Sequence, residues 1–365
     1  MKIAFIGTRG VPARYGGFET CAEELGRRLA ARGHEVWVYS RSGYAPQKKR
    51  EYCGMRVVIL PELRIKFLET LVHSFLALLS SLRERFDVVS VFNTANSPLL
   101  LCPFIRKKKI ILHTDGLEWK REKWGPVGRK YHRLAERLAA KLKVALVTDS
   151  RSIGAYFKKS YGRDSHYISY GATVESGRDS RLLDGLGLRP GLYFLQVTRF
   201  EPENNCHLTL RAFRDLKTDR RLVLVGGAAY STKYVRDLRR FRDDLILFPG
   251  FIYDRNMLRE LYANCCAYIH GNEVGGTNPA LLQAMGAGAF VIARDVPFNR
   301  EVLGEAGIYF ARNPGDLAEK MAWALDNADA AARMKSRAQD IIRRRYDWDK
   351  VATLYEDLCK ALAAG

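Results

Sequence analysis

A glycine-rich turn in the C-terminal half of the chain has the residue types of an anion-binding site. Residues 267–269 are apolar and predict a buried strand, and Pro279 begins a segment with helical spacing. Four small residues lie between them: Gly275, Gly276, Thr277 and Asn278. Glycine lets the backbone approach a ligand closely, and a helix N-terminus favours negative charge. The turn therefore predicts a phosphate or diphosphate site, although an ordinary strand-to-helix turn can have the same composition.

An arginine at the end of a predicted strand is a second candidate for phosphate binding. Residues 193–197 predict the first strand of the C-terminal half, and Arg199 follows its carboxyl end. A guanidinium group suits diphosphate oxygens, and the alternative is a surface arginine without a ligand. Further residues that follow predicted strands could contact the same ligand: Asn204, Gly226, Phe251, His270 and Glu273.

The N-terminal loop combines glycines with arginines. Its glycines lack the G-x-G-x-x-G spacing of a dinucleotide site, and the strand predicted over residues 35–40 has no acidic residue at its end. NAD binding therefore has weak support. Gly16 and Gly17 instead predict the start of a helix, with Arg9 and Arg14 beside it. These arginines could bind phosphate oxygens or could be solvated surface residues.

A polar segment follows the strand predicted over residues 109–113. His113, Asp115 and Glu118 could bind sugar hydroxyls or act as a base, and Trp119 could stack on a sugar ring. The alternative is a capped turn, in which Asp115 accepts from backbone donors and Trp119 packs in a core.

Strands alternate with helices along the whole chain, which predicts parallel, doubly wound α/β sheets. A Gly-, Ser- and Asp-rich segment at about residues 171–190 separates two rounds of this alternation. We therefore expect two Rossmann-like domains facing across a cleft, residues 1–172 and 173–345. A helix over residues 346–365 could pack back on the first domain. Ligands of such sheets bind at the carboxyl ends of the strands, where the candidate residues lie.

Composition and charge narrow the class of partner. The chain has 365 residues, of which 47% are hydrophobic and 27% charged, as in globular proteins. No signal peptide or membrane-spanning segment is recognisable, and seven scattered cysteines fit a reducing cytoplasm. The net charge is +20, with +17 in residues 1–170 and +3 in the remainder. We expect an anionic partner of the first half, such as a membrane surface or a lipid-linked diphosphate, and we expect no nucleic acid because no nucleic-acid module is recognisable.

Taken together, these segments resemble the retaining GT-B nucleotide-sugar glycosyltransferases over essentially the whole chain. The resemblance rests on Arg199, on the turn at residues 248–251 and on the glycine-rich turn that opens a helix with LLQAM. It implies that the arginine and the turn amides hold the donor diphosphate, and that the closing helix binds the ribose. The stretches GTRGVPARYGGFET, DGLEWKREKW and GGTNPALL further resemble a bacterial rhamnosyltransferase subgroup.

Three positions depart from the family pattern. The family usually has two glutamates eight residues apart, where this chain has Gly275 and Gln283, with Glu273 two residues early. The usual lysine five residues after the arginine is Asn204. His270 precedes the turn and could supply a polar contact instead. Arg9, Arg14 and Arg199 would then have to neutralise more of the negative charge on the leaving diphosphate.

The resemblance leads us to expect sugar transfer from a nucleotide diphosphate sugar, such as dTDP-rhamnose, to a saccharide or lipid-linked saccharide in bacterial surface polysaccharide synthesis. It implies retention, no metal and no cofactor. Arg199, Asp115 and His113 are the expected catalytic residues, and Glu118 and Trp119 the expected acceptor contacts. We expect a cytoplasmic enzyme, peripheral on the inner face of the membrane. Two alternatives are a nucleotide-sugar epimerase of similar architecture and a non-catalytic protein that binds a membrane surface.

Overall fold

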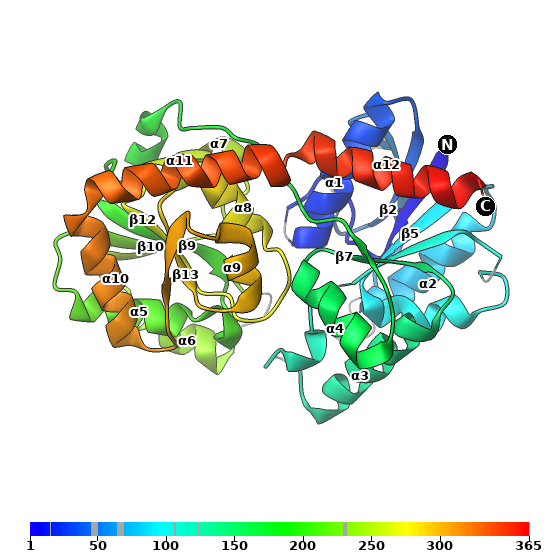
Figure 1. Cartoon of the computed structure of the whole chain (residues 1–365), viewed down its shortest axis with the longest axis horizontal. Coiled ribbons are helices and arrows are strands. Elements are labelled where there is room, and N and C mark those ends of the chain that lie inside the picture. The colour runs from blue at the N-terminus through cyan, green and yellow to red at the C-terminus, as the bar shows by residue number, and fades with distance from the viewer. Residues whose placement is uncertain are drawn as a thin grey trace. The chain divides into compact units, whose positions relative to one another are not determined.

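The chain forms two compact units in a computed structural model (Figure 1). The structure describes residues 1–14, 16–44, 50–63, 69–105, 107–114, 116–122, 124–228 and 232–364. Unit 1 comprises Met1–Lys120, Trp124–Tyr170 and Trp348–Gly365, and unit 2 comprises Arg121–Lys123 and Gly171–Asp347. The predicted fold class, two Rossmann-like doubly wound α/β domains, is confirmed.

Unit 1 contains an eight-stranded sheet in the order β3-β4-β2-β1-β5-β6-β7-β8. All neighbouring strands are parallel except β3 and β4. The strands are β1 (Lys2–Ile6), β2 (Glu35–Arg41), β3 (Glu51–Tyr52), β4 (Met55–Leu60), β5 (Val88–Phe92), β6 (Ile110–His113), β7 (Ala145–Thr148) and β8 (His166–Tyr167). The helices are α1 (Gly17–Ala31), α2 (Glu69–Ser81), η1 (Thr94–Leu101), η2 (Glu118–Lys120), α3 (Pro126–Lys141), α4 (Arg151–Tyr161) and α12 (Trp348–Ala364).

Helices cover both faces of this sheet. Buried side chains of α2, η1, α3 and α4 form one core cluster with alternate residues of β1, β5 and β6. The other face carries α1 and α12, which pack against each other as the blue and red helices of Figure 1. The apolar segment at residues 65–85 predicts a helix, of which α2 covers residues 69–81, and residues 65–68 lie outside the described residues.

Unit 2 contains a six-stranded parallel sheet in the order β11-β10-β9-β12-β13-β14. The strands are β9 (Tyr193–Arg199), β10 (Arg221–Gly227), β11 (Ile246–Gly250), β12 (Ala267–His270), β13 (Val291–Arg294) and β14 (Gly307–Phe310). The helices are η3 (Ser180–Leu186), η4 (Pro202–Asn204), α5 (Cys206–Asp215), α6 (Lys233–Arg239), α7 (Arg255–Asn264), α8 (Pro279–Gly286), α9 (Pro297–Leu303), α10 (Pro314–Asp326) and α11 (Ala328–Arg345).

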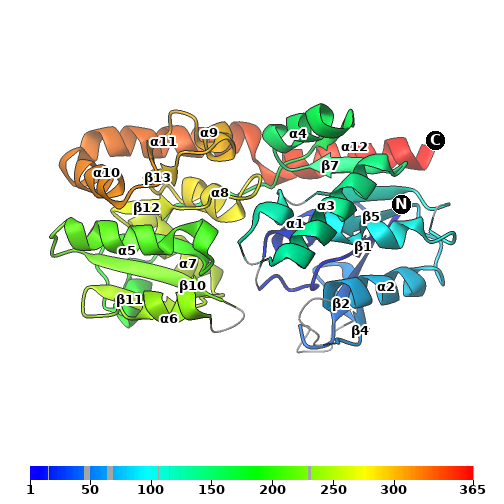
Figure 2. The same cartoon turned by 90° about the horizontal axis from the view of Figure 1, so that it is seen from below.

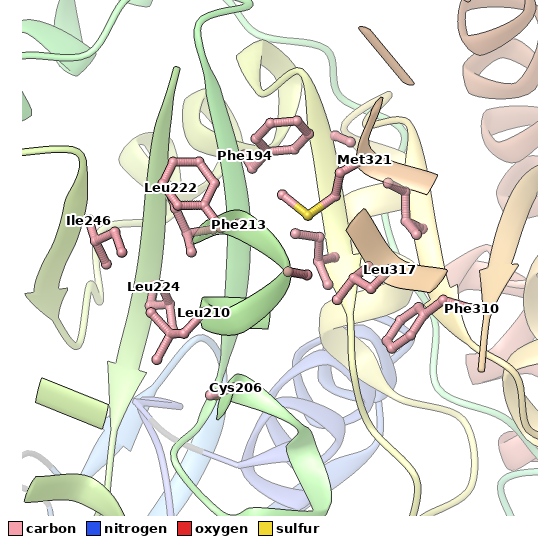
Figure 3. Close-up of a cluster of buried hydrophobic side chains, with 14 of the residues drawn as sticks. Phe194, Cys206, Leu210, Phe213, Leu222, Leu224, Ile246, Phe310, Leu317 and Met321 are labelled. Carbon is pink, nitrogen blue, oxygen red and sulfur yellow. The ribbon is translucent and has the colours of Figure 1, made fainter. Parts of the chain in front are cut away.

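The core of unit 2 lies between its sheet and the helices α5, α6 and α10. Figure 3 shows Phe213 of α5 and Met321 of α10 beside strand residues such as Phe194. Because these strands are covered on both faces, they are almost continuously apolar, as parallel strands usually are. This rigid sheet fixes the positions of the loops that leave its carboxyl edge.

Candidate functional site

The strand order of unit 2 creates a natural binding point at its carboxyl edge. β9 is the first strand, and the chain then adds β10 and β11 on one side and β12, β13 and β14 on the other. β9 and β12 are therefore neighbours whose following loops diverge, and ligands of open α/β sheets bind at such a switch point. Arg199 ends β9 and His270 ends β12, so the sheet brings these two predicted residues to one edge.

The glycine-rich turn leads into α8 as the sequence predicts. Asn278 is the N-cap, its Oδ1 accepts from the Ala280 N–H at 3.0 Å, and Pro279 occupies the first turn. The carbonyl of Asn278 also accepts from the N–H groups of Leu281 and Leu282. The first helical N–H groups are thus used within the helix, and the donors for a ligand would come from the turn itself.

Two features leave room beside this turn. Gly275 has a φ of 151°, and nothing lies within 4 Å of where a Cβ would be. Gln283 is exposed on the second turn of α8, while its neighbours Leu282 and Ala284 are buried in the core. A ligand at the turn could therefore extend along the outer side of α8 to the Gln283 amide.

Arg199 is held at the edge but keeps access to solvent. Its side chain is 32% exposed and lies 3.6 Å from a Glu201 carboxylate oxygen. Asn204, in contrast, is buried, and its Nδ2 donates to the Arg199 carbonyl at 2.8 Å. The Asn204 carbonyl accepts from Gln196 Nε2 at 2.9 Å. Asn204 therefore secures the loop that carries Arg199.

A second arginine beside this loop was not predicted from the sequence. Arg121 is buried, belongs to unit 2, and its Nη1 lies 3.9 Å from carboxylate oxygens of both Glu201 and Glu203. Carboxylates that are buried or partly buried are usually paired with a cation, but the sequence does not show that Glu201 and Glu203 are enclosed. Arg121 lies 80 positions before Glu201, so the sequence gives no sign that the two residues form an ion pair.

His270 and Glu273 occupy the loop after β12. His270 is fully buried, its Nδ1 lies 3.2 Å from the Tyr268 hydroxyl, and burial lowers its pKa to about 3. Its Nε2 has no hydrogen-bond partner among the described residues. The carboxylate of Glu273 accepts from Arg294 Nε at 2.7 Å and lies 3.5 Å from Arg312. Glu273 is therefore held in an ion-pair network.

The glycines that end β10 permit close packing. Gly226 has a φ of 129°, and a Cβ there would lie 1.9 Å from the Thr198 carbonyl oxygen. A Cβ on Gly227 would lie 2.8 Å from the ring of Phe251, which is partly exposed and stacks on Tyr253 with 6.0 Å between ring centroids. Phe251 thus presents part of its ring at the carboxyl edge.

In unit 1, the loop that carries Arg9 is organised by acidic side chains. α1 begins at Gly17, as predicted, and Gly16 before it has a φ of 106°. The Arg9 N–H donates to Glu19 Oε1 at 2.9 Å. Burial raises the pKa of Glu19, and Arg9 acts against that shift. The Arg14 guanidinium lies 5.8 Å from the centroid of the Tyr44 ring.

His113, predicted as catalytic, lies in the interior of unit 1. Its ring stacks on Phe92 with 4.2 Å between centroids, and Nε2 lies 3.2 Å from Ser90 Oγ and 3.1 Å from the Tyr355 hydroxyl. Burial lowers its pKa to about 3. This environment is that of a packed core histidine. Asp115 lies outside the described residues.

The two tryptophans near Glu118 are each bound to a buried carboxylate. Trp124 Nε1 donates to Glu118 at 3.0 Å, and Trp119 Nε1 donates to Glu136 at 3.2 Å. Glu136 also accepts from two tyrosine hydroxyls of α4, both at 2.7 Å. Trp119 is partly exposed, and the Arg133 guanidinium lies over its ring, 4.4 Å from the centroid.

Two family models match the chain and together span most of it. Residues 189–341 match the model described as glycosyl transferases group 1, and residues 15–175 match the model described as glycosyltransferase family 4. None of the curated proteins matches the chain. No helix among the described residues is long and apolar enough to cross a membrane.

Several solved structures share the fold. Sucrose-phosphate synthase from Thermosynechococcus elongatus is 18% identical with a TM-score of 0.85, over 100% of this chain and 99% of that chain. HepE from Anabaena, in complex with UDP-glucose, is 19% identical with a TM-score of 0.79, over 99% and 100%. The catalytic domain of starch synthase IV from Arabidopsis thaliana, bound to ADP and acarbose, is 14% identical with a TM-score of 0.71, over 100% and 99%. The fold is therefore the GT-B fold.

Proposed function

We propose, because two glycosyltransferase family models match residues 15–175 and 189–341, that the chain transfers rhamnose from dTDP-rhamnose to a hydroxyl group of a saccharide or lipid-linked saccharide. The identity of the donor and of the acceptor is inferred from the residues of the site and from the sequence resemblance. The observation that carries the proposal is that Arg199 ends β9 and the glycine-rich turn follows β12, the strand next to β9 in the sheet.

The donor diphosphate would lie at the switch point of unit 2. Arg199 would contact its oxygens, and the turn N–H groups of Gly276, Thr277 and Asn278 would donate to them. Charge builds up on the diphosphate as the bond to the sugar breaks, so donors fixed in advance stabilise the transition state more than the ground state. Asn204 and Arg121 would contribute by holding the loop of Arg199 in place.

Some group must take up the proton of the acceptor hydroxyl, and His113 is not suited to be that base. Its ring is enclosed by Phe92 and Tyr355, and burial keeps its pKa at about 3. We propose a retaining reaction in which an oxygen of the departing diphosphate takes this proton. We also propose that arginine and backbone donors serve the leaving group without a metal ion.

The nucleotide preference follows from Gln283. A glutamate there could accept charged hydrogen bonds from both ribose hydroxyls, whereas the exposed amide of Gln283 offers one carbonyl oxygen and one donor group. The loss of the 2′-hydroxyl then matters less, which supports a deoxyribose donor. HepE and starch synthase IV were solved with ribonucleotides, UDP and ADP, and this comparison makes the nucleotide a direct question for experiment.

Donor turnover with and without an acceptor tests the proposal. The protein would be incubated with dTDP-rhamnose alone and with a rhamnose-accepting lipid-linked saccharide, and dTDP, free sugar and glycosylated product would be followed. We expect release of dTDP to accelerate with acceptor and to match glycosylated product. An epimerised nucleotide sugar without acceptor would indicate an epimerase, and nucleotide sugar left intact under both conditions would favour a binding protein.

A further inference from the structure

One helical layer of unit 1 exposes an unusual amount of apolar surface. α2, η1 and α3 share this layer, and η1 packs against both helices, whose cyan-to-teal ribbons can be followed in Figure 2. Of the 13 exposed large hydrophobic side chains among the described residues, eight lie between Leu63 and Leu134. Exposed apolar surface gathered in this way marks an interaction face.

The outer side of α2 supplies the apolar part of this face. No charged residue occurs from Thr70 to Leu82. Ala77 and Leu78 are buried against the sheet, while Phe75, Leu79 and Leu82 are exposed. Phe75 and Leu79 are four residues apart and lie on one side of α2, and Leu82 follows directly after the helix ends at Ser81. Packing on the sheet therefore explains the apolar residues on the inner side of α2, but not those on its outer side.

The outer side of α3 supplies positive charge. Residues 124–143 contain six Lys or Arg residues and a single acidic residue, Glu136. Glu136 is buried and accepts from Tyr156 and Tyr161, so it does not offset the charge outside. Val127 and Leu134 lie two turns apart among these cations and are 83% and 61% exposed. A helix with interspersed cations and apolar residues is suited to the surface of an anionic bilayer.

We infer that the outer sides of α2, η1 and α3 form one docking surface for an anionic lipid bilayer. The cations of α3 contact lipid phosphates, and the apolar side chains of α2 enter the headgroup region. This inference rests on the proposed function, because a lipid-linked acceptor is carried by such a bilayer. The positive charge of the first half predicts a membrane partner, and the exposed apolar side chains of α2 add a second contribution to binding. A bilayer fits better than an acidic protein because the cations extend along a whole helix beside an uncharged one.

Vesicle co-sedimentation with matched variants tests the docking surface. The proteins are the wild type, R129Q/R137Q on α3, F75S/L79S on α2, and R236Q/R239Q on α6 of unit 2 as a control with equal loss of charge. All substituted side chains are exposed, and melting curves check that each variant is folded. The vesicles are phosphatidylcholine alone or mixed with phosphatidylglycerol, at low and high salt.

The two parts of the surface give different signatures. R129Q/R137Q should weaken binding to anionic vesicles about 30-fold at low salt, because each cation near the bilayer contributes roughly fivefold. F75S/L79S should remove the binding that persists at high salt, a loss of about tenfold. The α6 control should bind as the wild type does. Equal binding of all four proteins, or a wild type that does not bind anionic vesicles, would overturn the inference.

Calorimetry with dTDP and UDP on the same proteins separates this inference from the proposed function. A wild type that binds nucleotide and no vesicles would refute the docking surface and leave sugar transfer standing. A wild type that binds vesicles through α2 and α3 but neither nucleotide would support the surface and refute the nucleotide-sugar donor.

Discussion

Two buried histidines at strand ends, one in each unit, have similar pKa values and different surroundings. Burial lowers the pKa of His113 and of His270 to about 3. The ring of His113 is stacked on Phe92, and its Nε2 lies within hydrogen-bonding distance of Ser90 and Tyr355. His270 uses Nδ1 toward Tyr268, while its Nε2 has no partner among the described residues.

The difference shows how a strand-end histidine can be assigned. A ring whose nitrogen is engaged and whose face is stacked contributes to packing, so His113 belongs to the architecture of unit 1. A buried nitrogen without a partner is costly, and such atoms are tolerated mostly where a ligand or water completes them. His270 therefore remains a candidate at the switch point of unit 2, next to the loop of Arg199.

The largest effect on activity is expected at Arg199. Arg199→Ala should slow sugar transfer by about two to three powers of ten, the usual loss for one preorganised electrostatic contact. Its fold should survive because the side chain is partly exposed. Arg214→Ala, which removes the exposed pair with Asp243, is the control and should leave transfer unchanged. A wild-type rate for Arg199→Ala would remove the arginine from the diphosphate site.

His113→Ala should separate stability from chemistry. Removing a buried, stacked and hydrogen-bonded ring should lower the free energy of unfolding by roughly 2 to 4 kcal/mol. Transfer per folded molecule should stay close to that of the wild type. Denaturant unfolding and steady-state kinetics on the same preparation would show this. If the variant is as stable as the wild type but its turnover number is strongly reduced, His113 would be a catalytic residue.

Acid should destabilise the protein through both histidines. In the unfolded chain a histidine takes up a proton below about pH 6.5, whereas these buried rings do so only near pH 3. The unfolded state binds more protons between these values, so stability falls as the pH drops through this window, by up to about 1.4 kcal/mol per histidine and pH unit. Melting temperatures of His113→Asn should decline less steeply with acid than those of the wild type. Parallel curves would contradict the assignment.

Gln283→Glu should produce the smallest effect. Hydrogen bonds to charged groups contribute about 1.5–3 kcal/mol and neutral ones about 0.5–1.5 kcal/mol, so a glutamate should favour UDP over dTDP by about 1 kcal/mol more than Gln283 does. That difference is several-fold in affinity. Calorimetry with both nucleotides measures it. A wild type that strongly prefers UDP would remove the argument for a deoxyribonucleotide donor.

Local signals predicted most of the fold. Glycine before α1 and proline at the start of α8 mark helix starts that the structure confirms, and apolar runs mark the central strands. The short hairpin of β3 and β4 was missed, although Cys53 and Gly54 between the strands both have positive φ, as its two-residue turn requires. A Cys-Gly pair is a weak turn signal, which explains the omission.

The parts that could not be predicted depend on contacts between distant residues. Nothing near Arg121 in the sequence indicates that it pairs with Glu201 and Glu203. The burial of His113 requires Tyr355 of α12, which lies 242 positions away. The Glu136 carboxylate looks like one more surface charge on a basic helix until α4 brings two tyrosines to it. Local periodicity carries no information on such pairings.

Hydrogen–deuterium exchange with dTDP would show whether the turn at residues 275–278 donates its N–H groups to a nucleotide diphosphate beside Arg199. Saturating dTDP should slow exchange in peptides that cover this turn, with no such protection in Arg199→Ala at the same nucleotide concentration. Unchanged exchange at the turn while calorimetry shows that dTDP is bound would place the diphosphate elsewhere and contradict the account.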